Sequence, residues 1–389
     1  MIFTASSFYR SLVVLAVVTL CISTPASAQN VFVNDITGTG ARNFSDPTIW
    51  PTVPGPSNQA IIDFGDGTTD YVFVDAATSV GRINIGNANS GGLEIRSGAT
   101  LTTTATGGSQ SNIGPTGSGH LSILSGATLN QDGLLYLGLN AAGTGMVTLS
   151  DNGTHTLGGA LAIRDGTGVY DMLGGTLTVG GFFQVARNGN GTFTQSGGTL
   201  QANHSLATQQ GMFIAGGVGA VGLYEIRGGS LAVADTNLGV INGTTNVTGG
   251  AFGIFRIVGS APTVTIGSNY DQRLDARFEV VIDSGGVSPM NIGGNVSLDG
   301  GLGVSFTTVP IIGQQFTIMN YSGDLTGLFS EFDKLVDSPS GPNSVLLRVD
   351  YGTGTDSSVV LTVVPEPSTL VLLGSGLGLM MLVRRRRVS

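Results

Sequence analysis

Cysteine, lysine and charge of either sign are scarce in this 389-residue sequence. Cys21 is the only cysteine and lies in an N-terminal segment that we expect to be removed. The mature chain is therefore predicted to lack disulfides, thiolate metal sites and thiol nucleophiles. Lys334 is the only lysine, charged residues make up 11% of the chain, and the formal net charge is −9. Such a surface repels phosphate backbones, which excludes nucleic acid as a partner.

Residues for catalysis or metal binding are also few. The three histidines, His120, His155 and His204, have no mutual spacing suited to a metal ion, and we interpret them as exposed turn residues. Asp63, Asp66 and Asp70 cluster around two glycines and are weak candidates for calcium, because the EF-hand pattern is missing. We therefore expect no cofactor and interpret the acidic cluster as a solvated loop.

Glycine, in contrast, is abundant, with 63 residues and no Gly-X-Y period. A Gly followed by a Thr/Ser-hydrophobic pair recurs along the middle of the chain. The apolar residue of this pair is the anchor of each repeat, and the anchors are Leu101, Leu129, Leu157, Leu177, Leu200, Leu231 and, in a worn copy, Val264. Short alternating segments precede them, and alternation with period two is typical of strands with one buried face.

Each repeat thus holds about three short strands that cannot bury their apolar face alone. Stacking successive repeats buries a continuous core. The predicted fold is all-β, a right-handed parallel β-solenoid with a C-terminal β-domain and a single C-terminal hydrophobic helix. About seven coils, spaced by roughly 4.8 Å, would form a rod on the order of 35 Å long. A β-sandwich of loosely similar hairpins is the alternative.

The N-terminus has the order of a secretion signal. Arg10 precedes an apolar run from Leu12, and the small residues Ala26 and Ala28 follow it. The run is too short for a stable membrane span, so cleavage after Ala28 is expected, with an uncleaved anchor as the alternative.

The C-terminus combines three features in order. Pro365 and Pro367 hold Glu366 in an extended segment, because each proline ring fixes φ and disfavours helix in the residue before it. An apolar stretch from Leu370 to Val383 follows. A basic stop comes next and would remain on the cytoplasmic face; it consists of Arg384, Arg385, Arg386 and Arg387.

This tail resembles the PEP-CTERM family of exported bacterial proteins, over roughly the last 26 residues. The resemblance implies that an exosortase-like membrane processing enzyme recognises Pro365, Glu366 and Pro367. It also implies a producer of exopolysaccharide and a precursor held transiently in the inner membrane. The repeats are similar to the Gly-Gly-Thr-Leu strand repeats of autotransporter passengers, which supports the solenoid more than any activity.

The expected organisation has five parts. They are a signal peptide at 1–28, an N-terminal β cap at 29–80, a repeat β-solenoid at 81–268, a C-terminal β-domain at 269–363 and a sorting tail at 364–389. Within the tail we expect the motif at 364–370, a transmembrane helix at about 368–383 and the basic stop at 384–387.

The function expected from these features is that of an exported cell-surface or extracellular-matrix protein, structural or adhesive and associated with exopolysaccharide. The alternative is a polysaccharide lyase or glycoside hydrolase on the same scaffold. Such an enzyme needs two carboxylates on either side of the sugar. Its candidate acids are Asp151, Asp165 and Asp171, which are close in sequence but are not shown by it to share a face.

Overall fold

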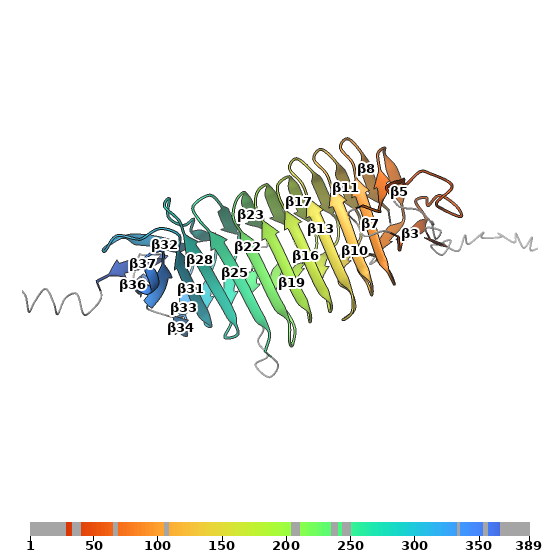
Figure 1. Ribbon diagram of the computed structural model, residues 1–389. Coiled ribbons are helices and arrows are strands. Elements are labelled where there is room, and N and C mark those ends of the chain that lie inside the picture. Colours follow the sequence, from red (N-terminus) through yellow and green to blue (C-terminus); the bar gives the residue numbers. More distant parts are fainter. Residues whose placement is uncertain are drawn as a thin grey trace, which may run out of the picture.

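The computed structural model describes residues 29–32, 40–64, 69–104, 109–203, 211–234, 240–242, 250–332, 335–352 and 357–365. These residues form an elongated rod of 37 strands, without a helix in any described range (Figure 1). No helix in the described ranges is therefore long and apolar enough to span a membrane. The signal peptide and the helix expected at about 368–383 lie outside them.

Three long sheets form the sides of the rod, each built from every third strand along most of its length. The first sheet contains β1 (Gln29–Phe32), β3 (Asn58–Ile62), β6 (Arg82–Ile85), β9 (Gln110–Ile113), β12 (Leu134–Leu137), β15 (Leu161–Ile163), β18 (Phe183–Val185), β21 (Met212–Ile214), β24 (Val240–Asn242), β27 (Tyr270–Gln272), β30 (Val296–Leu298) and β33 (Leu325–Gly327). The second contains β2 (Arg42–Asn43), β4 (Val72–Val74), β7 (Ser90–Ile95), β10 (Ser118–Ile123), β13 (Thr144–Leu149), β16 (Thr167–Met172), β19 (Asn190–Gln195), β22 (Val221–Ile226), β25 (Phe252–Val258), β28 (Ala276–Ile282), β31 (Gly301–Phe306) and β34 (Glu331–Phe332).

The third sheet completes each coil. It contains β5 (Thr78–Val80), β8 (Thr100–Thr103), β11 (Thr128–Gln131), β14 (Thr154–Leu157), β17 (Thr176–Val179), β20 (Thr199–Ala202), β23 (Ser230–Val233), β26 (Thr263–Ile266), β29 (Met290–Ile292), β32 (Gln315–Tyr321), β37 (Ser358–Val364), β36 (Gly341–Asp350) and β35 (Leu335–Ser338). From β3–β5 to β30–β32 the chain makes ten complete coils of three strands.

This pairing confirms the parallel β-solenoid and shows that the sandwich alternative is wrong. The estimate of seven coils was too low, because worn repeats stack as regularly as the clear ones. Parallel pairing starts with β1 on β3 and continues to β31 on β34, so the ladders extend beyond both ends of the segment 81–268. The right-handed winding and the division into cap, solenoid and C-terminal domain stay predictions.

The second glycine of the Gly-Gly-Thr-Leu repeats is required by the backbone conformation and by the close contact between coils. Gly198 has a φ of +71°, and a Cβ there would lie 2.3 Å from the carbonyl oxygen of Gly175 in the coil before it. Only glycine combines this left-handed conformation with so close an approach of two backbones. The following Thr-Leu pair then enters the strand with Leu200 inward and fully buried.

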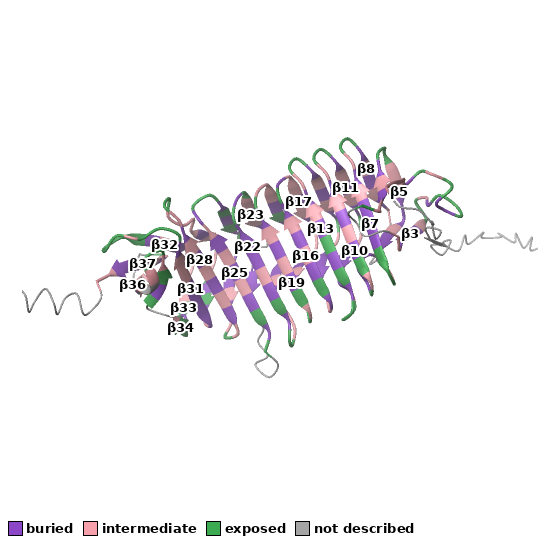
Figure 2. Ribbon diagram, in the orientation of Figure 1, coloured by how far each residue is buried: buried purple, intermediate pink, exposed green. Residues whose placement is uncertain are grey.

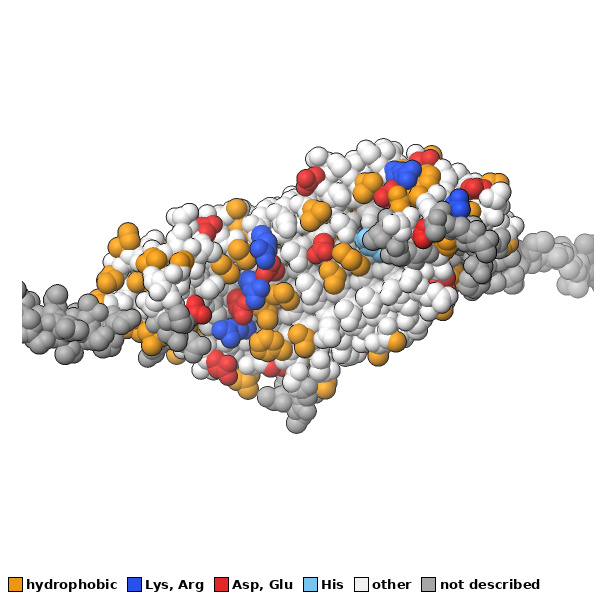
Figure 3. All heavy atoms as spheres, viewed as in Figure 1, with side chains coloured by type: hydrophobic (Ala, Val, Ile, Leu, Met, Phe, Trp, Pro, Cys, Tyr) orange, Lys and Arg blue, Asp and Glu red, His pale blue; other side chains and the backbone are white. Residues whose placement is uncertain are grey.

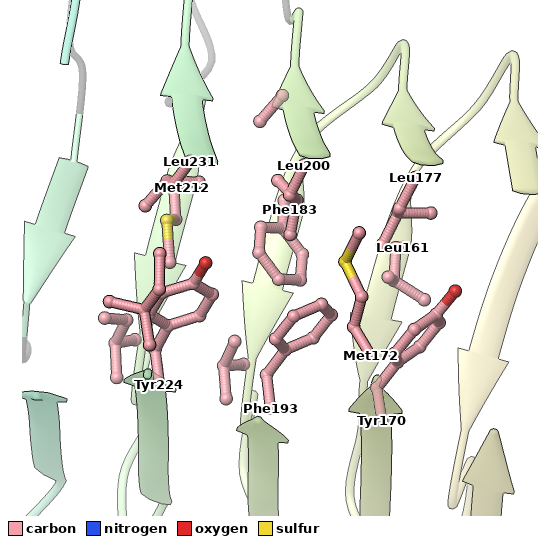
Figure 4. Packing of buried hydrophobic residues seen from close by; sticks show 14 of the residues in the cluster. Leu161, Tyr170, Met172, Leu177, Phe183, Phe193, Leu200, Met212, Tyr224 and Leu231 are labelled. Atoms are coloured by element: carbon pink, nitrogen blue, oxygen red, sulfur yellow. The ribbon is translucent and has the colours of Figure 1, made fainter. Parts of the chain in front are cut away.

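Side chains alternate between the core and solvent along most strands (Figure 2). The inward row of the second sheet changes from aliphatic to aromatic residues in its middle, where Tyr170, Phe193 and Tyr224 are paired strand to strand. Their rings stack with centroids 4.8 and 5.3 Å apart, and Figure 4 shows Phe183 and Met212 packed against them. Each aromatic pair adds about 0.5–1.5 kcal/mol beyond burial of its surface.

The two ends of the rod are closed differently. At the N-terminal end Trp50 is buried against Phe44, and its indole N–H donates to the Phe44 carbonyl at 2.8 Å. At the C-terminal end β37 pairs antiparallel with both β32 and β36, which extends the third sheet beyond its last parallel strand. The N-terminal segment thus packs large side chains onto the end of the core, and the C-terminal strands add an antiparallel extension to the third sheet.

Candidate functional site

The described chain ends where the candidate sorting motif begins. β37 lies between β32 and β36, so both of its edges are hydrogen-bonded, and it stops at Val364. Pro365 follows directly and is half-buried. Glu366, Pro367, the stop Arg384–Arg387 and the signal residues Ala26 and Ala28 lie outside the described residues. The candidate motif therefore follows directly after a strand that is hydrogen-bonded on both sides.

A hollow of about 590 Å³ lies beside the C-terminal end of β37. It is lined mainly by apolar residues of the C-terminal strands: Phe329, Ser330, Phe332, Leu346, Leu347, Arg348, Val349, Tyr351 and Val364. Among the described residues that line it, Arg348 is the only charged side chain and none is Asp, Glu, His or Cys.

The outer face of the second sheet carries most of the ion pairs in the described chain. Three strands, β22, β25 and β28, place Glu225, Arg256 and Glu279 side by side in register. Arg256 contacts Glu225 at 2.8 Å and Glu279 at 2.6 Å, while Arg227 and Arg277 contact the same two carboxylates. Figure 3 shows basic and acidic side chains gathered on this face of the rod. Burial raises the pKa of Glu225, but the hydrogen bonds from Arg256 and Arg227 outweigh it and leave the pKa below the usual value.

The same outward row continues with uncharged groups and one acid. Thr194, Asp171, Thr148 and Ser122 follow Glu225 on successive strands. Burial raises the pKa of Asp171 above its usual value, although His120 and the hydroxyl of Thr194 act in the opposite direction. Asp171 and Glu225 are therefore two carboxyl groups whose pKa values are shifted apart, two rungs or roughly 10 Å from each other.

The three acids expected for an enzyme site are not brought together. Asp151 is exposed in the turn between β13 and β14, beyond the C-terminal ends of the strands of the second sheet. Asp165 lies in the turn between β15 and β16, before the N-terminal ends of the strands of the second sheet, and accepts a hydrogen bond from Asn188 at 2.6 Å. Asp171 projects from β16 between them. The sequence did not point to Glu225, which the structure places in the row of Asp171.

Asp63 and Asp70 bind backbone groups rather than one another. Asp63 accepts the N–H groups of Asn87 and Ala88, and Asp70 accepts that of Gly40. Asp66 lies outside the described residues. Within those residues no three His, Cys, Asp or Glu side chains are grouped as metal ligands would be.

The interpretation of the histidines as exposed turn residues was wrong for both of those that the structure describes. His155 lies within β14 and is fully buried, and His120 lies within β10 and is half-buried. His204 is outside the described residues. The register pairs Leu129 with His155 and His155 with Leu177, so His155 holds the anchor position of its coil and Leu157 lies two residues beyond it.

A buried hydrogen-bond triad surrounds this histidine. Its Nε2 lies 2.8 Å from Oε1 of Gln131, and its Nδ1 lies 2.8 Å from the hydroxyl of Tyr170. A carboxamide oxygen only accepts, so Nε2 carries the proton and Nδ1 accepts from Tyr170. Burial lowers the pKa of His155 to about 3, which keeps the ring neutral at physiological pH. The triad is enclosed in the core and is a structural element.

Comparison with known families bears on the tail. Residues 363–387 match the model of the PEP-CTERM protein-sorting motif. Neither the curated proteins nor the solved structures contain a match for the chain. The matched segment begins inside β37 and includes the Pro365-Glu366-Pro367 motif and the basic stop. The chain therefore carries a PEP-CTERM sorting motif, which starts in the last strand of its β-solenoid.

Proposed function

We propose that this protein is an exported structural or adhesive component of the bacterial cell surface or extracellular matrix, delivered through its PEP-CTERM tail. The position of the motif carries this proposal, because the matched segment begins within the last described strand and continues directly from it. An exosortase-like enzyme would read Pro365, Glu366 and Pro367 at that point. The apolar stretch and the four arginines would hold the precursor in the inner membrane until it is processed.

The outer face of the third sheet supports a structural rather than a catalytic role. Two parallel rows cross it strand by strand, and neither contains a charged residue over seven coils. One row is Thr100, Thr128, Thr154, Thr176, Thr199, Ser230 and Thr263, and the other is Thr102, Asn130, Thr156, Thr178, Gln201, Ala232 and Thr265. An extended face of hydroxyl and amide groups suits contact with a neutral polysaccharide matrix, which is the partner that we propose.

The sorting role is tested by replacing Pro365, Glu366 and Pro367 with Ala in the native host. We expect full-length protein to accumulate in the membrane fraction, because the enzyme loses the residues that it reads. Cell fractionation and mass spectrometry of the C-terminus measure this accumulation. The exposed prolines Pro51 and Pro56, changed to Ala, provide a matched control that should be processed normally. Release of the triple variant at the wild-type rate would show that the motif is not recognised.

One observation favours a second candidate, glycoside hydrolysis. Asp171 has the raised pKa of a general acid and Glu225 the lowered pKa of a base, at a separation close to that of inverting enzymes, about 6.5–9.5 Å. Against this, Arg256 and Arg227 already occupy the carboxylate of Glu225.

We expect the full chain to release no reducing ends from neutral glucans or uronate polymers. Each carboxylate oxygen of Glu225 already contacts an arginine, Oε1 with Arg227 and Oε2 with Arg256, so the carboxylate is poorly placed to take a proton from water. A reducing-end assay measures this. Turnover that is abolished by Asp171→Asn but retained by Asp165→Asn would establish the second candidate instead.

A further inference from the structure

One loop exposes a run of apolar side chains at the C-terminal end of the rod. It connects β31 to β32 and contains Val309, Ile311 and Ile312, which are 59, 75 and 60% exposed. Large aliphatic side chains are otherwise mostly buried in this chain, and Figure 3 shows hydrophobic side chains gathered at this end. Exposed apolar residues that adjoin one another indicate an interaction surface.

The loop is fixed beside the origin of the sorting tail. The N–H of Gly313 donates to the carbonyl of Val363 at 2.8 Å, and the N–H of Val363 donates to the carbonyl of Gln314 at 2.9 Å. Gln314 also accepts the N–H of Ile311 through its side-chain oxygen, which closes the tip of the loop. The apolar tip is thus tied to the strand that ends one residue before Pro365.

The loop and the strands that hold it, β31, β32 and β37, carry no charged side chain. The sequence has no Asp, Glu, Lys or Arg between Asp299 and Asp324, and none in β37. Charged side chains follow on β36, where Arg348 and Asp350 pair with Thr362 and Val360 of β37. Transferring charged groups out of water is costly, whereas transferring aliphatic side chains is favourable. A membrane interface is therefore the environment that suits this tip.

We propose that the loop 309–312 inserts into the membrane interface of the precursor and forms a second lipid contact beside the C-terminal tail. The inference rests on the proposed function, because it takes the tail to be anchored in the same bilayer. Two contacts, one from the tail and one from the loop, would hold the end of the rod against the membrane and fix its orientation while the Pro-Glu-Pro segment is read.

The test uses the full chain with Cys21→Ser and Ile311→Cys, labelled with an environment-sensitive fluorophore. The chain is reconstituted into vesicles of phosphatidylethanolamine and phosphatidylglycerol. We expect a blue shift of emission and quenching by spin-labelled lipids. The matched control is Val218→Cys, a site 57% exposed in the turn between β21 and β22, at which neither effect is expected.

The outcomes separate this inference from the proposed function. In one outcome the chain floats with the vesicles, but the fluorophore at residue 311 shows no more blue shift or quenching than the fluorophore at residue 218. This result would overturn the loop contact and leave the membrane anchor in place. Failure to float would overturn both. A probe at residue 311 that is shielded without vesicles, in a chain that sediments as an oligomer, would assign the loop to contact with a second copy and also overturn the membrane proposal.

Discussion

Deleting residues 102–129 is expected to leave a folded rod that is one coil shorter. The register pairs Leu101 with Leu129. The deletion joins Leu101 directly to Asn130, so Leu101 takes the position that Leu129 holds in the intact chain. The strands on either side meet neighbours of the same kind, because β7 and β13 both pair in register with the removed β10. Since each coil contacts mainly its two neighbours, stability should fall by little more than one coil's contribution. Circular dichroism and urea unfolding measure this result.

The matched control removes only residues 102–116. This shorter deletion interrupts a coil, so the inward faces of the following strands no longer coincide with those of the preceding coils. Leu121 and Ile123 are fully buried in the intact protein and would lose that burial. Each such side chain contributes about 1.5–3 kcal/mol, so a loss of several kcal/mol is expected. Equal unfolding of the two variants would mean that the coils are not independent units.

The sequence was sufficient to predict the coils because their signal is steric and periodic. A residue with positive φ, usually glycine, precedes an inward anchor, usually leucine, in most coils and leaves a trace that repeats along the chain. The first complete coil, β3–β5, was harder to recognise, since β5 pairs in register with β8 without the Gly-Thr-Leu pattern. Backbone pairing fixes a coil even where its sequence has drifted.

The candidate sites were predictable to different degrees. The sorting tail was recognisable because a short motif, an apolar stretch and a basic stop follow one another in the chain. The proximity of Asp171 to Glu225 was not predictable, because 53 positions lie between them in sequence while only one strand lies between them in the sheet. The loop beside Val363 was missed for the same reason, since exposure depends on how distant segments pack.

The anchor at His155 shows how a plausible motif match can mislead. Leu157 follows a Thr as the other anchors do, and the match seemed complete. In the structure Leu157 pairs with Gln131 and Val179, one inward position later in the strand. Histidine is rarely expected at a fully buried position, and only its partners Gln131 and Tyr170, supplied by neighbouring coils, make that position acceptable.

Stability is expected to fall between pH 6.5 and about pH 3 through the titration of His155. Its pKa is about 3 in the folded chain and 6.5 in a free side chain, so the unfolded state binds more protons in this window. The stabilisation is complete above pH 6.5 and is lost as the pH falls toward 3. The free energy of unfolding should fall by on the order of 2 kcal/mol between pH 6.5 and 5, because the unfolded side chain takes up its proton over this range while the folded one does not. Urea unfolding at several pH values measures the slope.

Substitution by the residues of neighbouring coils separates this titration from that of the carboxyl groups. His155→Leu restores the anchor residue of Leu129 and Leu177 and should abolish the slope between pH 6.5 and 5. The single change leaves the Tyr170 hydroxyl and the Gln131 oxygen buried without partners, at a cost of about 1–3 kcal/mol each. Adding Tyr170→Phe and Gln131→Leu removes those groups, so the triple variant should recover most of the loss at pH 7. A slope that persists in both variants would assign the acid sensitivity to the carboxyl groups rather than to His155.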